Sequence, residues 1–213
     1  MGLQRNNFMF IEFAYQYFGN SFANLRMLEY GNQHIGHQTE LPEDATPELC
    51  EVFKNCSSGK EFFETLGVKH TSVDINGQDG ALVLDLSKPL NKPEWIGNFD
   101  IVTNFGTVEH IDQDGFRGQY EAFKTLHECL RVNGLTQHIM PMHGYYRKHC
   151  KFHYKLGFFI DLAAHNNYEI AHLDFLDVDE SKRKIRAIGI KKENNPFMSW
   201  EAFSRLTSIT RLS

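Results

Sequence analysis

The sequence predicts an α/β protein with a doubly wound, mostly parallel sheet of seven strands. Short apolar runs alternate with longer mixed segments, as strands alternate with crossover helices in a parallel sheet. Hydrophobic residues make up 41% and charged residues 23% of the 213 residues, which is typical of a globular protein. Because no internal repeat is visible and the length suits one core, we expect a single domain over residues 1–213.

The expected strands are short runs of branched and aromatic residues that end at glycine, proline or polar residues. They are residues 26–30, 71–75, 81–84, 99–103, 135–140, 169–176 and 185–190.

The expected helices lie between these strands. In residues 119–130 the spacing of Tyr120, Phe123 and Leu126 gives one apolar helical face, and Asn133-Gly134 is a stop signal. Residues 32–70 are about twice as long as one crossover needs, so we expect a crossover helix over 60–66 and an insertion before it. Residues 194–213 form a C-terminal extension with a short helix from Ser199 onward.

Residues 1–25 are expected to form an aromatic helical cap. Rings at helical spacing indicate core packing or a homodimer contact, and a helix here would also shield a substrate pocket from water. The rings are Phe8, Phe10, Phe13, Tyr17 and Phe18.

Charge and composition exclude several partners. With 22 basic against 27 acidic residues the net charge is −5, so we expect neither nucleic acid nor an anionic membrane surface as a partner. No run reaches the roughly 18 to 20 apolar residues that cross a bilayer. The apolar run at 8–18 is interrupted by Glu12 and is followed by no signal-peptide cleavage site.

The four cysteines form no CxxC pair, which indicates reduced thiols and a cytoplasmic protein.

Acidic residues close the first three expected strands. Glu29 and Gly31 end the first, where glycine allows the backbone to approach a ligand. Asp74 ends the second, where a carboxylate can accept hydrogen bonds from both hydroxyls of a ribose, and Asp85 follows the third, where it could bind an adenine amino group. Together they indicate a nucleotide-like ligand at the carboxyl edge of the sheet.

Two further motifs resemble those of the class I S-adenosylmethionine-dependent methyltransferases. One is the strand Phe99-Asp100-Ile101-Val102 followed by Val108-Glu109-His110-Ile111. The other, Leu130-Arg131-Val132-Asn133-Gly134, is similar to the family's L-R/K-x-G-G, with Asn133 in place of the first glycine. The resemblance covers roughly residues 26–140 and implies a Rossmann-like fold whose last two strands form an antiparallel pair.

The resemblance also implies S-adenosylmethionine as cofactor and a role for each matching position. Glu29, Gly31 and Asn32 belong to the methionine-side loop, and Asp74 with Ile75 to the ribose site. The remaining positions are the adenine contacts Asp85 and Leu86, and the methionine-facing Asn104 and Phe105.

The loop after the first strand departs from the family pattern E-x-G-x-G-x-G. Gln33 and Ile35 stand at its second and third glycine positions, so Gln33 could narrow the loop beside the methionine carboxylate. A non-catalytic S-adenosylmethionine-binding protein is therefore the alternative to an enzyme. The dinucleotide motif G-x-G-x-x-G is absent.

Two histidines are candidate general bases. His143 follows the fifth strand, and a neutral imidazole there could accept a proton from a hydroxyl; His110 is the rival. His149 and His153 could share a helix face, but no carboxylate completes a zinc pattern, and we expect no metal.

The leading interpretation is an S-adenosylmethionine-dependent methyltransferase that acts on a small-molecule acceptor, with oxygen as the expected acceptor atom. The cationic side chains after the fifth strand indicate a solvated basic face or a site for an anionic acceptor. They are Arg147, Lys148, Lys151 and Lys155.

Overall fold

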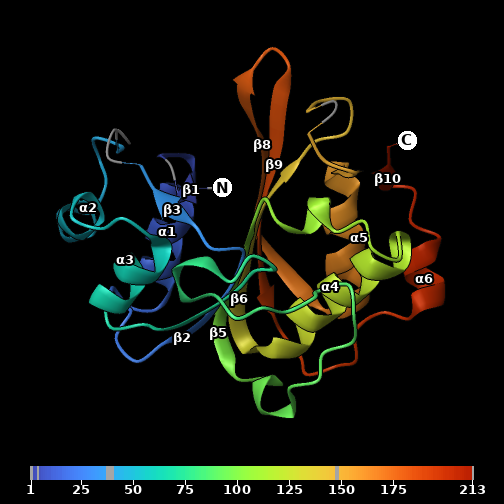
Figure 1. The fold of residues 1–213 in the computed structure, drawn as a ribbon, viewed down its shortest axis with the longest axis horizontal. Helices are drawn as coiled ribbons and strands as arrows, with labels where there is room; N and C mark the ends of the chain where they lie inside the picture. Colours follow the sequence, from blue (N-terminus) through green and yellow to red (C-terminus); the bar gives the residue numbers. More distant parts are fainter. Residues whose placement is uncertain (1, 4, 37–40, 147–148, 213) are drawn as a thin grey trace. The chain divides into compact units, whose positions relative to one another are not determined.

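The chain forms two compact units, Met1–Leu84 and Asp85–Ser213, which Figure 1 colours blue to blue-green and green to red. The computed structural model describes residues 2–3, 5–36, 41–146 and 149–212. Arg147 and Lys148 of the expected basic face, and residues 37–40 of the insertion, lie outside the described residues.

Unit 1 contains the parallel strand pair β2 (Arg26–Tyr30) and β4 (Lys69–Val73), in register from Arg26 opposite Lys69 to Tyr30 opposite Val73. A second, short parallel pair joins β1 (Gly2–Leu3) to β3 (His34–Ile35). The helical elements of this unit are α1 (Arg5–Tyr17), α2 (Pro47–Lys54), α3 (Gly59–Thr65) and the short η1 (Gln78–Gly80).

Aromatic rings make up much of the core of unit 1. Phe8 of α1 meets Phe53 of α2 edge to face with ring centroids 5.5 Å apart, and Phe53 meets Phe62 of α3 at 5.4 Å. Edge-to-face pairs of this kind add to the stabilisation from apolar burial. The insertion between β2 and β4 is therefore packed into the unit.

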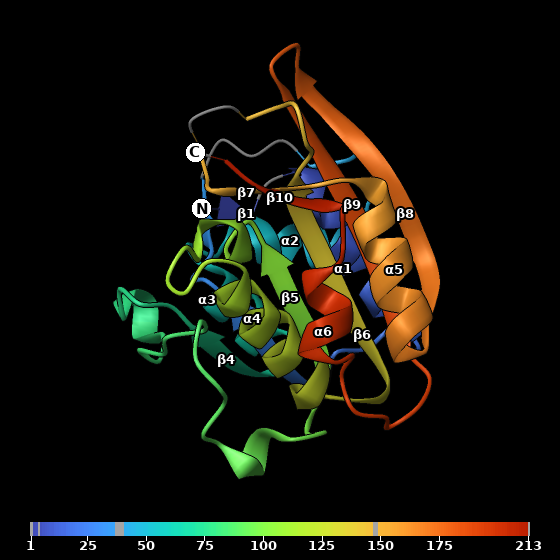
Figure 2. The ribbon, with the colours of Figure 1, turned by 90° about the vertical axis from the view of Figure 1, so that its right-hand side faces the viewer.

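Unit 2 contains four neighbouring strands. Strand β5 (Phe99–Phe105) runs parallel to β6 (Leu130–Pro141), and β9 (Lys182–Lys191) lies antiparallel between β6 and β8 (Tyr168–Asp179). Figure 2 shows the helices on one side of these strands. They are α4 (Phe116–Cys129), α5 (Leu156–Asn166) and α6 (Trp200–Ser204).

The remaining elements of unit 2 are short. An antiparallel pair joins β7 (Phe152–Tyr154) to β10 (Ile209–Arg211), and two helical turns are η2 (Pro93–Trp95) and η3 (Val108–His110). The β8–β9 hairpin extends past the end of β6 as a two-stranded ribbon, in orange in Figure 1.

The α/β class and the antiparallel last pair are confirmed, but seven mostly parallel strands is wrong. Residues 81–84 form no strand, because only Leu82 pairs, in an isolated bridge with Val73. Leu82 and Val83 are 45% and 71% exposed, so this apolar run is not a core strand. The larger sheet strands described are thus two in unit 1 and four in unit 2. Of the three neighbouring pairs among the four strands of unit 2, the two that β9 makes with β6 and β8 are antiparallel.

Several element boundaries differ from the prediction. The helix expected over 119–130 is α4, which ends at Cys129 and passes directly into β6, before Asn133-Gly134. The Nζ of Lys191, on β9, donates hydrogen bonds to the carbonyls of His127 and Leu130 at 2.7 and 2.9 Å, which satisfies acceptors that this direct junction leaves open.

The helix face that the spacing of His149 and His153 would allow is not formed. His153 lies in strand β7 and His149 in the turn before it. Within the part of the chain that the structure describes, no helix has the length and apolar character needed to cross a membrane.

Candidate functional site

The carboxyl ends of β2 and β4 carry the predicted residues of unit 1. Strand β2 ends at Tyr30, and Gly31 follows with φ 84°, a left-handed conformation that favours glycine. The Gly31 N–H donates to the Val73 carbonyl at 2.8 Å, so the chain turns away only after this residue. Glycine here leaves the backbone open to a close ligand.

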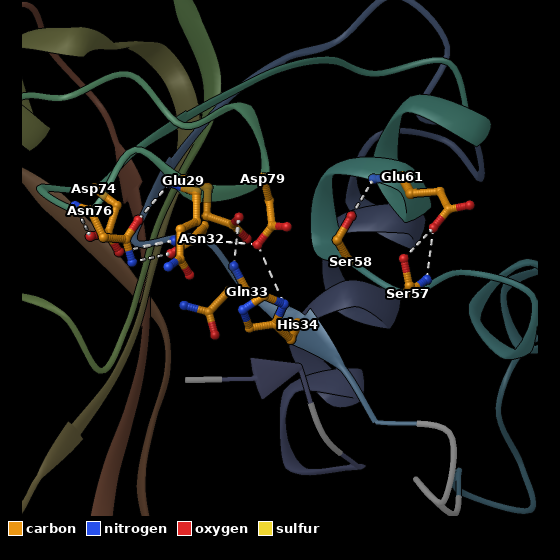
Figure 3. A network of polar contacts seen from close by, with 11 residues as sticks. Glu29, Asn32, Gln33, His34, Ser57, Ser58, Glu61, Asp74, Asn76 and Asp79 are labelled. Atoms are coloured by element: carbon orange, nitrogen blue, oxygen red, sulfur yellow. Dashed lines mark hydrogen bonds and ion pairs between the residues drawn. The ribbon is translucent and has the colours of Figure 1, made fainter.

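Asp74 ties two segments together at this edge (Figure 3). Its Oδ2 accepts from the Asn32 N–H at 3.4 Å and its Oδ1 from the Asn76 N–H at 3.0 Å. The side chain of Ile75, which lies between Asp74 and Asn76 in the sequence, is 69% exposed. A half-buried carboxylate thus stands beside a solvent-facing apolar side chain.

Asp79, which the sequence did not single out, lies in the same network. Its Oδ2 accepts from Asn32 Nδ2 at 3.0 Å and lies 3.4 Å from His34 Nδ1, while Asn76 Nδ2 donates to Asn32 Oδ1 at 3.3 Å. The loops after β2 and β4 are therefore bound to one another by side chains. No motif signals Asp79, because it is positioned by a turn in which it adopts φ 53°.

Gln33 and Ile35, at the family's glycine positions, turn inward. Gln33 is 2% exposed, and its carbonyl accepts from the Gly59 N–H at 2.7 Å; Ile35 is buried and its N–H donates to the Ser57 carbonyl at 2.8 Å. A Cβ on Gly59 would lie 3.4 Å from Gln33 Cβ and 3.1 Å from Glu29 Oε1. The absence of a side chain at Gly59 thus avoids a tight contact with Glu29, and the main-chain N–H of Gln33 donates to Glu29 in the network of Figure 3.

Glu29 is buried beneath this loop. Its Oε2 accepts from the Gln33 N–H at 3.4 Å and lies 3.5 Å from Nε2 of the buried His70. The predicted loop carboxylate therefore faces the interior of unit 1 and holds the loop from below.

Asp85 and Leu86 begin unit 2. Asp85 Oδ1 accepts from the Ser87 N–H at 2.9 Å and from Ser87 Oγ at 2.6 Å, and Leu86 between them is buried. The carboxylate is exposed, with its orientation fixed by this local turn.

Asn104, near the end of β5, is fully buried and its side chain is engaged within unit 2. Its Oδ1 accepts from the N–H groups of Thr107 and Val108 at 3.2 and 3.1 Å, and its Nδ2 donates to Met140 Sδ at 3.3 Å. It therefore holds the turn η3 against the strand. Any cofactor contact at Asn104 or Phe105 is expected from the main chain.

The two candidate bases differ in environment. Burial, and secondarily the neighbouring His149, whose ring centroid is 5.1 Å away, lower the pKa of His110, which favours its neutral form. His143 is exposed, and its N–H donates to the Tyr154 carbonyl at 2.7 Å. Both lie in unit 2, at or beyond the carboxyl ends of the parallel strands β5 and β6.

Glu109 is the residue of unit 2 that the sequence analysis did not single out. It is 3% exposed, and none of the described residues hydrogen-bonds to its Oε2. Burial raises the pKa of its carboxyl to about 8, while a hydrogen bond from its own backbone N–H and the charge of Lys184 act in the opposite direction. Burial cannot be read from a sequence motif, so its only signal was its place in the Val108-Glu109-His110-Ile111 motif.

Among the described residues, no cluster of three or more histidine, cysteine or acidic side chains could hold a metal ion.

Comparison with known proteins identifies the fold. No protein-family model and no curated protein sequence matches the chain. Among solved structures it matches 1,6-didemethyltoxoflavin-N1-methyltransferase of Burkholderia thailandensis with a TM-score of 0.54 and 12% identity over 85% of this chain and 76% of that one. It matches geranyl diphosphate C-methyltransferase of Streptomyces coelicolor at 0.53 and 11%, over 86% and 80%.

A third match, a methyltransferase of Methanosarcina mazei, has a TM-score of 0.51 and 11% identity over 79% of this chain and 93% of that one. The chain has the Rossmann-like fold of the class I S-adenosylmethionine-dependent methyltransferases. The first two of these structures each hold S-adenosylhomocysteine and a further small molecule.

Proposed function

We propose that this protein is an S-adenosylmethionine-dependent methyltransferase acting on a small-molecule acceptor, at oxygen. The observation that carries the proposal is the edge of unit 1 at which Asp74 lies beside the exposed Ile75, with Gly31 directly after the neighbouring strand β2. A carboxylate that can bind ribose hydroxyls next to an apolar surface suits an adenosine.

The loop after β2 fits this cofactor. Gln33 and Ile35 are packed inward and pinned to residues 57–59, so their side chains do not fill the outer side of the loop. This favours an enzyme over the alternative of a binding protein with a degenerate loop. The backbone of Gly31 and the carboxylate of Asp74 would hold the methionine and ribose portions.

The cofactor, when bound, supplies a methyl group already activated by the positive sulfur. The chain has to align the acceptor, exclude water and take up the hydroxyl proton as the new bond forms. His143 is the proposed base, with His110 as the second candidate. The comparison structures include an N- and a C-methyltransferase, so transfer to oxygen is the finer part of the proposal.

The test is turnover. Purified protein is incubated with S-adenosylmethionine and a panel of hydroxylated aromatic and aliphatic acids, and S-adenosylhomocysteine is measured. Acceptor-dependent product supports the proposal. Binding of the cofactor without turnover across the panel would favour the non-catalytic alternative, and methylation only at nitrogen or carbon would contradict O-methylation.

A further inference from the structure

Unit 2 contains an apolar cavity of about 40 Å³ between its helices and its strands. The walls come from α4, α5, β6, β8 and β9, and Figure 2 shows the two helices on one side of these strands. Most of the lining side chains are buried and apolar, among them Phe123, Leu126, Phe159, Leu162 and Ile188. The cavity therefore belongs to the interior of unit 2.

One polar side chain in the wall of this cavity lacks a hydrogen-bond partner. His138 of β6 is 3% exposed, and its Nε2 lies 2.7 Å from Oγ1 of Thr136, which also lines the cavity. None of the described residues hydrogen-bonds to its Nδ1. The rings of Phe123 and Phe159 lie beside the imidazole, with centroids 5.9 and 5.2 Å from its own. Because buried polar atoms are nearly always paired, an open nitrogen beside an apolar cavity indicates a ligand.

The lining carries no charge near neutral pH. Burial lowers the pKa of His138 to about 3, so its imidazole is neutral at pH 7. Among the described residues that line the cavity there is no aspartate, glutamate, lysine or arginine. An ion bound here would have no counter-charge, so the cavity fits an uncharged ligand.

A single water molecule would find few partners in this cavity, because a buried water makes about three hydrogen bonds. The hydroxyl of Tyr168 lies 2.9 Å from His127 Nδ1, and that of Thr136 is paired with His138. Nδ1 of His138 is the open polar side-chain atom among the described lining residues. In a neutral imidazole this nitrogen donates or accepts according to the tautomer, and a hydroxyl group matches both roles.

Size and access limit the rest of the ligand. A cavity of roughly 150 Å³ holds benzene, so a cavity of about 40 Å³ has room for only about two or three heavy atoms. Ile170 of β8 also lines the cavity and is 40% exposed, so the wall reaches solvent at this side chain. A flat ring is too large for this space, whereas a short carbon chain fits.

We propose that this cavity binds a short primary alcohol, whose hydroxyl pairs with Nδ1 of His138 and whose carbon chain lies among the apolar side chains between α5 and the strands. Binding is non-covalent and needs neither the cofactor nor a catalytic base, so the inference is independent of the proposed function. A ligand in this position stabilises the folded state of unit 2.

The test is an NMR titration of ¹⁵N-labelled wild-type protein with ethanol, followed at the backbone amides and at the ring nitrogens of His138. Ethanol should bind saturably, with a dissociation constant on the order of 1 mM or weaker, because so small a ligand makes few contacts. The Nδ1 resonance should shift as its hydrogen bond forms. Shifts that do not saturate, or an unchanged Nδ1 resonance, would overturn the inference.

Ala163→Val and Ala164→Val are a matched pair of variants on α5. Ala163 is buried and lines the cavity, so the two added methyl groups should fill it and weaken ethanol binding by about tenfold or more. Ala164 is exposed and does not line the cavity, so Ala164→Val should bind ethanol as wild type does. Equal affinities of the two variants would contradict the proposed location.

Two further probes test the chemistry on wild-type protein, and they decide even if Ala163→Val fails to fold. Xenon should enter the cavity, because apolar cavities bind it, and phenol should not displace ethanol, because its ring is too large. Binding of xenon without binding of ethanol would show that the cavity selects no hydroxyl group and would overturn the inference. Displacement of ethanol by phenol would overturn the assignment to a short primary alcohol.

Discussion

The two carboxylate oxygens of Asp74 accept hydrogen bonds from different loops of unit 1, one from the N–H of Asn32 and one from the N–H of Asn76. If Asp74 also binds the ribose, Asp74→Ala should weaken S-adenosylmethionine binding by about 1–3 kcal/mol, the scale for a lost hydrogen bond to a charged group. Calorimetry measures this. Asp44→Ala, at an exposed position of the same unit, should bind as wild type does, and unchanged affinity of a folded Asp74→Ala would show that the ribose binds elsewhere.

The two candidate bases, His143 and His110, make separable predictions. With an acceptor identified, His143→Ala should lower turnover by on the order of 10² or more and leave cofactor affinity nearly unchanged. Steady-state kinetics and calorimetry on His143→Ala and His110→Ala show which of the two histidines acts as the base. Loss of cofactor binding in His143→Ala would make the residue structural, and full activity would assign the proton transfer to His110 or to solvent.

Among the elements, α1 was expected to pack inward or to form a homodimer. Phe8 and Phe10 are fully buried in unit 1, so these rings are core residues, whereas Tyr17 is 38% exposed. A homodimer through the outer rings of α1 stays a prediction.

The first turn of helix α4 is closely packed against its neighbours. A Cβ on Gly118 would overlap the Gln113 carbonyl oxygen and approach Ser87 Cβ to 3.1 Å. Gly118→Ala should therefore destabilise the protein by about 1–3 kcal/mol, the usual cost of overpacking. Urea denaturation measures this change.

Gly157 in the first turn of α5 is the control for that measurement. Its nearest neighbour would be Ser208 Cβ at 3.8 Å, which is ordinary contact. Gly157→Ala should be neutral or stabilising by up to about 1 kcal/mol, because alanine favours helix. Equal effects of the two substitutions would show that α4 can shift away from Gln113.

The contribution of Glu109 to the stability of the protein should fall as pH rises, whereas His127 and His138, whose pKa values burial lowers to about 4 and about 3, contribute in the opposite direction below pH 6.5. Burial raises the pKa of Glu109 from 4.5 to about 8, so the folded protein binds a proton there that the unfolded chain has lost. The contribution is fully present below pH 4.5 and declines until pH passes 8, a loss of about 3 kcal/mol by pH 7. Glu109→Gln should remove this dependence and raise the unfolding free energy at pH 7, as urea titrations from pH 5 to 9 would show. A variant less stable than wild type at pH 8 would contradict it.

The local sequence predicted some elements well and not others. Strand β2 was predicted to the residue because Gly31 ends it, and the last antiparallel pair followed from the family resemblance. Residues 81–84 look like a strand because periodicity reports apolar side chains and not whether a neighbouring strand pairs with them.

The sequence predicted where the residues of the candidate site lie along the strands better than it predicted what their side chains contact. Asp74, Ile75 and Gly31 lie at strand ends as expected, but the amide of Asn104 binds a turn and Glu29 points inward. Asp79 and Glu109 depend on a turn conformation and on burial, neither of which a spacing pattern encodes.

The close packing around Gly59 has an evolutionary consequence. A Cβ at this position, at the start of α3, would lie 3.1 Å from Glu29 Oε1 and 3.2 Å from Leu3 Cδ1, both tighter than ordinary contact. Positions 3 and 59 are therefore expected to be epistatic: a larger residue at 59 is tolerated better when residue 3 is smaller, and a double-mutant cycle of Leu3→Ala and Gly59→Ala should be non-additive. In chains that descend from a common ancestor with this one, a large apolar residue at position 3 should accompany glycine at the start of the helix.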